Sequence, residues 1–149
     1  MTSRRADADH GWCSLRLRFD ERELVLLRAA EQVRGAELAR HARPDELRSA
    51  LVLAKAGQKL RLAVAGPSLV FEEGELRMLL TAVRFAHDEV HQAASQHGDS
   101  TDGRVQVVLS AFPELVERGL WRSFALTREL DELGQRLDLA LMPRSSEQN

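Results

Sequence analysis

The clearest hydrophobic pattern in the chain is a helical stripe between residues 73 and 97. Its apolar positions recur at intervals of three and four residues, the spacing of one face of an α-helix. A second stripe, formed by leucines, lies in the segment 127–141, which begins with Thr127, a residue type that favours the N-cap position. Its members are Leu130, Leu133, Leu137 and Leu141. The members of the first stripe are Leu76, Leu79, Leu80, Val83, His87, Val90 and Ala94. The pattern therefore predicts two long amphipathic helices.

Two further helices are predicted in the first half of the chain. Asp20 and Glu23 have the spacing of a capping box, so a helix is expected to begin directly after Asp20. Pro44 is suited to the first turn of the next helix, which we expect to run through Ala56 and to stop at Gly57.

Three segments are predicted to be strands. Residues 14–19 alternate apolar and polar side chains, which is typical of a half-buried strand. Residues 59–65 and 69–72 flank a Gly-Pro-Ser turn and predict a β-hairpin. The sequence thus predicts an α+β fold, dominated by helix, with a short antiparallel sheet.

The segment 104–112 fits either a helix or a strand. Its valines suit a strand, but its apolar positions also have helical spacing. Because a residue before proline avoids the helical conformation, we favour a helix that is interrupted at Pro113.

The chain is expected to form one domain over residues 11–142, with flexible polar tails at 1–10 and 143–149. The first tail has no apolar core of a secretory signal, and the chain contains a single cysteine, Cys13. These features predict a cytoplasmic protein. The strong preference for arginine over lysine suggests a bacterial source.

Residues 17–30 are similar to residues 69–82, at an offset of 52 positions. In each segment a phenylalanine, Phe19 or Phe71, is followed by acidic residues and then by a leucine stripe. This similarity suggests a duplicated strand–helix unit. The alternative is that strand-to-helix junctions commonly share these features.

The formal net charge is −2, which disfavours general binding to nucleic-acid phosphates. The charge is uneven, however, because residues 1–61 have a net charge of +4 and residues 62–149 one of −6. This asymmetry is consistent with self-association or with an oriented protein partner. It is equally consistent with helix faces that are simply solvated.

His87, His91 and His97 have a spacing that resembles the metzincin zinc-protease signature and is similar to that of a bacterial rRNA-maturation endoribonuclease family. Asp88 and Ala94 depart from the metzincin pattern at the general base and at the glycine turn. On a continuous helix the first and third histidines would lie about 15 Å apart along the axis, too far for one zinc ion. His87 and His91 therefore remain a candidate metal pair that needs a further ligand from elsewhere.

No other motif in the sequence points to catalysis or to a cofactor. The chain contains no glycine-rich phosphate loop and no Gly-x-Ser-x-Gly nucleophile motif, and Cys13 lacks a nucleophile motif. The acidic residues at 72–75 are explained by the positive end of the helix that follows. We expect no cofactor.

Two groups of residues are candidates for partner binding. Trp121, Arg122 and Phe124 combine the residue types that are enriched at interface hot spots, although both aromatics could instead close the core. Arg16 and Arg18 are predicted to share the solvent face of the first strand.

Taken together, these patterns favour a non-enzymatic, homodimeric protein-interaction or regulatory module. The dimer is expected because the two long leucine stripes exceed what so small a sheet can cover. The alternatives are a nucleic-acid accessory protein that uses the N-terminal arginines, and a metal-dependent hydrolase centred on His87 and His91. No membrane partner is expected.

Overall fold

Helices dominate the part of the chain that the computed structural model describes, which comprises residues 14–41, 43–95 and 103–142. For residues 117–122 it describes the backbone only. The elements in chain order are β1 (Ser14–Leu17), α2 (Glu21–His41), the 3₁₀ helix η1 (Pro44–Glu46), α3 (Leu47–Leu62), β2 (Leu69–Glu72), α4 (Glu73–Ser95), α5 (Gly103–Ala111) and α6 (Glu114–Leu141). The predicted helix-dominated α+β class with a short antiparallel sheet is confirmed.

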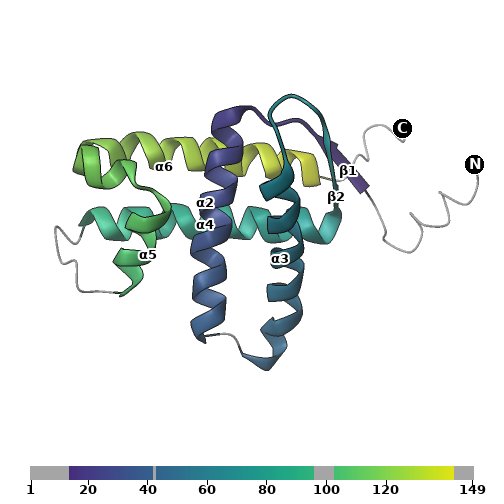
Figure 1. The fold of residues 1–149 in the computed structure, drawn as a ribbon, viewed down its shortest axis with the longest axis horizontal. Coiled ribbons are helices and arrows are strands. Elements are labelled where there is room, and N and C mark those ends of the chain that lie inside the picture. The colour runs from purple at the N-terminus through teal and green to yellow at the C-terminus, as the bar shows by residue number, and fades with distance from the viewer. Residues whose placement is uncertain (1–13, 42, 96–102, 143–149) are drawn as a thin grey trace, which may run out of the picture.

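β1 and β2 form a two-stranded antiparallel ribbon beside the helices (Figure 1). Leu15 lies opposite Phe71, and Arg16 lies opposite Val70. Phe71 is fully buried, whereas Arg16 and Val70 are exposed. The alternation that predicted the first strand is confirmed, although the strand ends at Leu17.

The predicted strand at 59–65 is wrong, because α3 continues to Leu62. The apolar residues of this segment alternate, but Leu60 extends the helical face that α3 buries against α2 and α4, whereas Leu62 is exposed. β2 pairs with β1, which lies more than fifty residues earlier in the chain, so the predicted hairpin does not form. Gly57, predicted to stop the helix, lies inside it. The buried positions of α3 are Leu53, Ala56, Gly57 and Leu60.

The predicted capping box at the start of α2 is confirmed. The backbone N–H of Glu23 donates to Oδ1 of Asp20 at 2.7 Å, and the N–H of Asp20 donates to Oε1 of Glu23 at 2.9 Å. Arg22 then donates hydrogen bonds to the carboxylates of Glu129 and Glu114. These hydrogen bonds, the one to Glu129 most strongly and the one to Glu114 next, raise the pKa of the Arg22 guanidinium. They also connect the start of α2 to α6.

α4 and α6 run antiparallel and side by side, and the hairpin of α2 and α3 crosses them (Figure 1). Their leucine stripes are buried against each other, and α4 also packs against α2 and α3. The interruption at Pro113 is confirmed, since α5 ends at Ala111 and α6 begins at Glu114. The predicted helix start at Thr127 is wrong, because α6 is continuous there and the Thr127 hydroxyl donates to the carbonyl of Phe124.

The ribbon brings the two similar segments of the sequence together. Leu17 and Leu69, which correspond at the 52-residue offset, are cross-strand partners. The corresponding rings of Phe19 and Phe71 meet edge to face, with centroids 6.4 Å apart. This register is the one that a twofold axis between the two strands would produce.

The two strand-to-helix junctions also share one hydrogen bond. Glu72 and Glu75 correspond to Asp20 and Glu23, and the N–H of Glu72 donates to Oε1 of Glu75 at 2.8 Å. The Asp20 N–H makes the same bond to Glu23. The structure therefore supports the duplicated unit over the explanation by general junction features.

Candidate functional site

The first unit consists of β1, α2 and α3, and the second of β2, α4 and α6. Each strand-to-helix junction is contacted by a cationic side chain from the last helix of the other unit. Lys59 on α3 lies against the second junction, where its Nζ is 2.6 Å from Oε1 of Glu75 and 3.1 Å from the carbonyl oxygen of Val70. The same Nζ lies 5.6 Å from the ring centroid of Phe71. Glu75 is 1% exposed, so Lys59 neutralises a buried carboxylate.

Arg136 on α6 repeats these contacts at the first junction. Its Nη1 lies 2.5 Å from Oε1 of Glu23, and its guanidinium carbon lies 5.0 Å from the ring centroid of Phe19. Arg136 also donates to the carbonyl oxygen of Arg18, which corresponds to Val70. The repeat therefore extends from a strand and a helix to a strand and two helices.

The sequence signal for this second half of the repeat lies at a different offset. Residues 53–63 and 130–140 share the pattern Leu-x-x-x-Gly-Gln-(Lys/Arg)-Leu-x-Leu-Ala at an offset of 77 positions. The offset grows from 52 to 77 because the second unit contains the extra helix α5 between its two main helices. A search at one fixed offset misses this pattern.

The two helices of each unit enclose equivalent grooves. In the first unit the groove between α2 and α3 has a volume of about 400 Å³ and is mostly apolar. Its lining residues are Glu31, Gly35, Leu38, Ala39, Leu47, Ala50, Leu53 and Ala54. In the second unit the groove between α4 and α6 measures about 230 Å³ and is more polar. Its lining residues are Arg84, His87, Asp88, Leu130, Asp131, Gly134 and Gln135.

Glu31 is the charged group of the apolar groove. Burial raises the pKa of its carboxyl group. The positive charge of Arg61, whose Nη1 lies 3.7 Å from Oε1 of Glu31, partly opposes that shift. Gly57 makes room for this carboxylate, because a Cβ at position 57 would lie 2.7 Å from Cδ of Glu31. In the second unit Val83 takes the corresponding place and contacts Gly134.

The candidate metal pair lies on α4. His87 is half-buried, and its Nδ1 is 3.1 Å from Oδ1 of Asp88, whereas His91 is exposed. Among the described residues, no three His, Cys, Asp or Glu side chains converge as a metal site would require. His97 and Cys13 lie outside the described residues. Metal binding by the pair stays a prediction.

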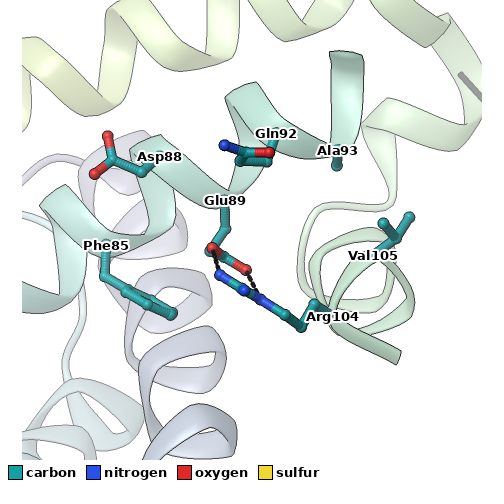
Figure 2. Close-up of a pocket in the computed structure, with 7 residues that line it drawn as sticks. All are labelled: Phe85, Asp88, Glu89, Gln92, Ala93, Arg104 and Val105. Atoms are coloured by element: carbon teal, nitrogen blue, oxygen red, sulfur yellow. Dashed lines mark hydrogen bonds and ion pairs between the residues drawn. The ribbon is translucent and has the colours of Figure 1, made fainter. Parts of the chain in front are cut away.

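A further pocket of about 390 Å³ lies between α4 and α5 (Figure 2). Arg104 of α5 points across it to Glu89 of α4, and its Nε lies 3.1 Å from Oε1 in a two-bond ion pair. Glu89 is 6% exposed, so this pair joins two helices around a desolvated carboxylate. Asp88 points away from the ion pair in Figure 2. The arrangement explains how α5 is attached to α4.

Of the three candidate residues on α6, Phe124 is the one whose side chain the structure describes. All five phenylalanines of the chain lie within the described residues, and only Phe124 is exposed, with 64% of its surface accessible. Val116, two turns earlier, is 68% exposed. Trp121 and Arg122 lie on the helix between them, and their side chains are outside the description. Phe124 therefore does not close the core.

Arg16 lies on the outward face of the ribbon, as predicted, whereas Arg18 is exposed one residue beyond the end of β1. Within the part of the chain that the structure describes, neither side chain forms an ion pair. The outward face that carries Arg16 also presents Val70, which is 43% exposed.

The sequence reasoning missed an exposed apolar face on α3. We call this face the outer stripe, and it consists of Leu47, Leu51, Ala54, Gln58 and Leu62. All five residues are exposed, and the three leucines are 56%, 72% and 86% exposed. Their spacing of four, three, four and four residues is that of a helical face, but the alternation at 59–65 predicts a strand there and hides it.

The chain was compared with family models, with curated proteins and with solved structures. No family model, no curated protein and no solved structure matches the chain. Among the described helices, none combines the length and the apolar character needed to cross a membrane.

Proposed function

We propose that this chain is a non-enzymatic protein-interaction module that acts as a homodimer and a regulator in the bacterial cytoplasm. The observation that carries the proposal is an equivalence between the two units. Phe124 on α6 corresponds to Leu47 on α3, and Leu139 corresponds to Leu62, at the 77-residue offset. All four are large apolar side chains, and all four are more than half exposed. Apolar side chains left exposed at repeated positions are typical of interaction surfaces.

The surface around Phe124 is the proposed site for a partner protein. An exposed aromatic ring offers a large contact area at a low cost in side-chain entropy, and Trp and Arg are the other residue types enriched at hot spots. Trp121 and Arg122 precede Phe124 on the same helix. We propose that these three residues form the centre of the contact.

The exposed outer stripe of α3, and not the long leucine stripes of α4 and α6, supports a homodimer. The stripes of α4 and α6 are buried within the chain, so they do not require a second copy. The outer stripe of α3 stays exposed and is available for one.

The experiment that tests the module compares proteins captured from the native organism by the tagged wild-type chain and by two variants. Phe124→Glu should abolish the capture of a specific partner. Val25→Glu is the control, because Val25 is an exposed apolar residue on α2, at 41%, and is not one of these repeated positions. A partner retained by Phe124→Glu, or lost equally from both variants, contradicts the proposed site.

A second candidate function, nucleic-acid binding, is favoured by the placement of Arg16 and Arg18. A two-stranded antiparallel ribbon fits the major groove of DNA, and Arg16 lies on its outward face while Arg18 is exposed just beyond its end. The net charge of −2 argues against broad electrostatic affinity. Fluorescence anisotropy with DNA and RNA duplexes at low salt tests this function. A loss of binding in Arg16→Ala/Arg18→Ala would support it, and no binding by the wild type would end it.

A further inference from the structure

α3 is apolar on two sides, and one side has no cover within the described chain. The inner side packs against α2 and α4. The outer stripe runs along the helix from Leu47 to Leu62, a length of about 24 Å at 1.5 Å per residue. A surface helix of a monomer normally has one apolar stripe, so a second stripe along the whole helix indicates a helical partner.

The charges of α3 leave the outer stripe close to neutral. The helix has four cationic residues and no acidic residue. Three of the four cations are paired within the chain: Lys55 with Glu72, Lys59 with Glu75, and Arg61 with Glu31. An acidic partner would find little uncompensated charge here, whereas a second neutral apolar stripe would fit.

The order of residues in the outer stripe is self-complementary. If two copies of α3 lie antiparallel about a twofold axis between Ala54 and Lys55, Leu47 of one copy meets Leu62 of the other. In the same register Leu51 meets Gln58, and Ala54 lies at the centre. A small residue at the crossing point allows two helices to approach closely.

The neighbouring groove provides room for a partner side chain. The groove between α2 and α3 borders the stripe at Leu47 and Ala54, and small residues line much of its wall. Leucines on a second α3 could enter it as a ridge enters a groove. An isologous dimer of this kind places the same patch on both copies, as twofold symmetry requires.

We infer that a second copy of this chain docks on the outer stripe, with α3 antiparallel to α3 and Leu47 of each copy against Leu62 of the other. This inference rests on the homodimer in the proposed function. It adds the surface, the orientation and the register of that dimer.

The first test is the mass of the full-length chain in solution, measured by sedimentation equilibrium at micromolar concentration. The wild type should be a dimer. Leu51→Glu should raise the dimer dissociation constant at least about a hundred-fold, because it buries an unpaired charge in the contact. Val116→Glu is the matched control, because Val116 is 68% exposed on α6, and this variant should stay dimeric. Circular dichroism should show unchanged helix content in both variants.

The second test fixes the register by disulfide crosslinking. In a Cys13→Ser background, the double variant Leu47→Cys/Leu62→Cys should form a covalent dimer under mild oxidation. Leu47→Cys alone should form none, because residue 47 faces residue 62 of the other copy.

The outcomes separate the two levels of the proposal. A monomeric wild type contradicts the homodimer and this inference together. A wild-type dimer that persists in Leu51→Glu overturns the α3 surface but keeps the homodimer. A crosslink in Leu47→Cys alone overturns the antiparallel register. A protein other than a second copy that is captured by the wild type and lost in Leu51→Glu, while the wild type alone is monomeric, assigns the stripe to that partner instead.

Discussion

Lys59 and Arg136 make equivalent contacts, but the carboxylates that they neutralise differ in burial. Glu75 is 1% exposed, whereas the side chain of Glu23 is 23% exposed. Removing one partner of a buried ion pair leaves a charge without compensation, and this costs far more than the loss of a solvated pair. The same contact should therefore contribute differently to the stability of the two units.

We expect Lys59→Met to lower the free energy of unfolding by about 3 kcal/mol and Arg136→Met by about 1 kcal/mol. Methionine keeps much of the aliphatic packing in both variants, so the difference reports the charge. Arg128→Met, which removes an exposed pair with Glu132, should change stability by less than about 0.5 kcal/mol. Urea unfolding at neutral pH measures all three. Equal losses in the first two variants would contradict the difference in burial.

At the scale of elements, each unit places a glycine where its second helix crosses its first. Gly57 on α3 faces Glu31, and Gly134 on α6 faces Val83. The neighbour decides how much room each position has. A Cβ at position 134 would make ordinary contacts of 3.7 and 3.9 Å, whereas a Cβ at position 57 would force the Glu31 carboxylate to move.

Gly134→Ala should therefore stabilise the protein by about 0.5–1 kcal/mol, the usual gain of alanine over glycine inside a helix. Gly57→Ala should stabilise the protein less than Gly134→Ala, or destabilise it, because the added methyl group displaces the Glu31 carboxylate. In a Glu31→Ala background, Gly57→Ala should regain the stabilisation. Thermal and urea unfolding of this double-mutant cycle measure the coupling between positions 31 and 57. A zero coupling energy would show that the two side chains do not interact.

For the whole molecule, the two units exchange their supporting contacts. The ribbon contains one strand from each unit, and α3 and α6 each contribute a cation to the junction of the other unit. α2 of the first unit also packs on α4 of the second. The units are thus joined by tertiary contacts as well as by the connection over residues 63–68.

Cleavage of that connection should leave the two fragments associated. A protease site inserted between Gly66 and Pro67, both exposed, allows the folded full-length chain to be cut after purification. The fragments should elute together in gel filtration and retain the helical circular dichroism signal. The uncut insertion variant is the control, and fragments that separate or precipitate on cleavage would contradict the exchange of contacts.

How much the sequence predicted depended on whether a pattern had one structural interpretation. The alternation at 14–19 and the stripe from Leu76 fixed the first strand and α4, because each has a single period over enough residues. The capping pair Asp20 and Glu23 located the start of α2 for the same reason. The same alternation correctly predicted Arg16 on the outward face of β1, since successive side chains of a strand point to opposite faces, but Arg18 lies beyond the end of the strand.

The errors occurred where local patterns were ambiguous. Residues 59–65 alternate like a strand, but residues 59–62 continue a helix, and the sequence alone does not reveal that β2 pairs with β1. Thr127 has the chemistry of an N-cap, but burial of Leu126 and Leu130 keeps α6 continuous across it. Strand pairing over more than fifty residues and burial by distant helices are non-local effects, and they overrode the local preference.

The sequence by itself determined the class of the fold, most of its helices, the inward and outward faces of its first strand, and the similarity of two junctions. These features depend on residues within a few turns of one another. Only the tertiary structure decided that the two units pair about a common ribbon, that Lys59 and Arg136 cross between them, and that the stripes of α4 and α6 are buried while that of α3 is left exposed. The physical reason is that an apolar stripe specifies a face that requires cover, but the arrangement of all the helices determines which stripe is covered within the chain.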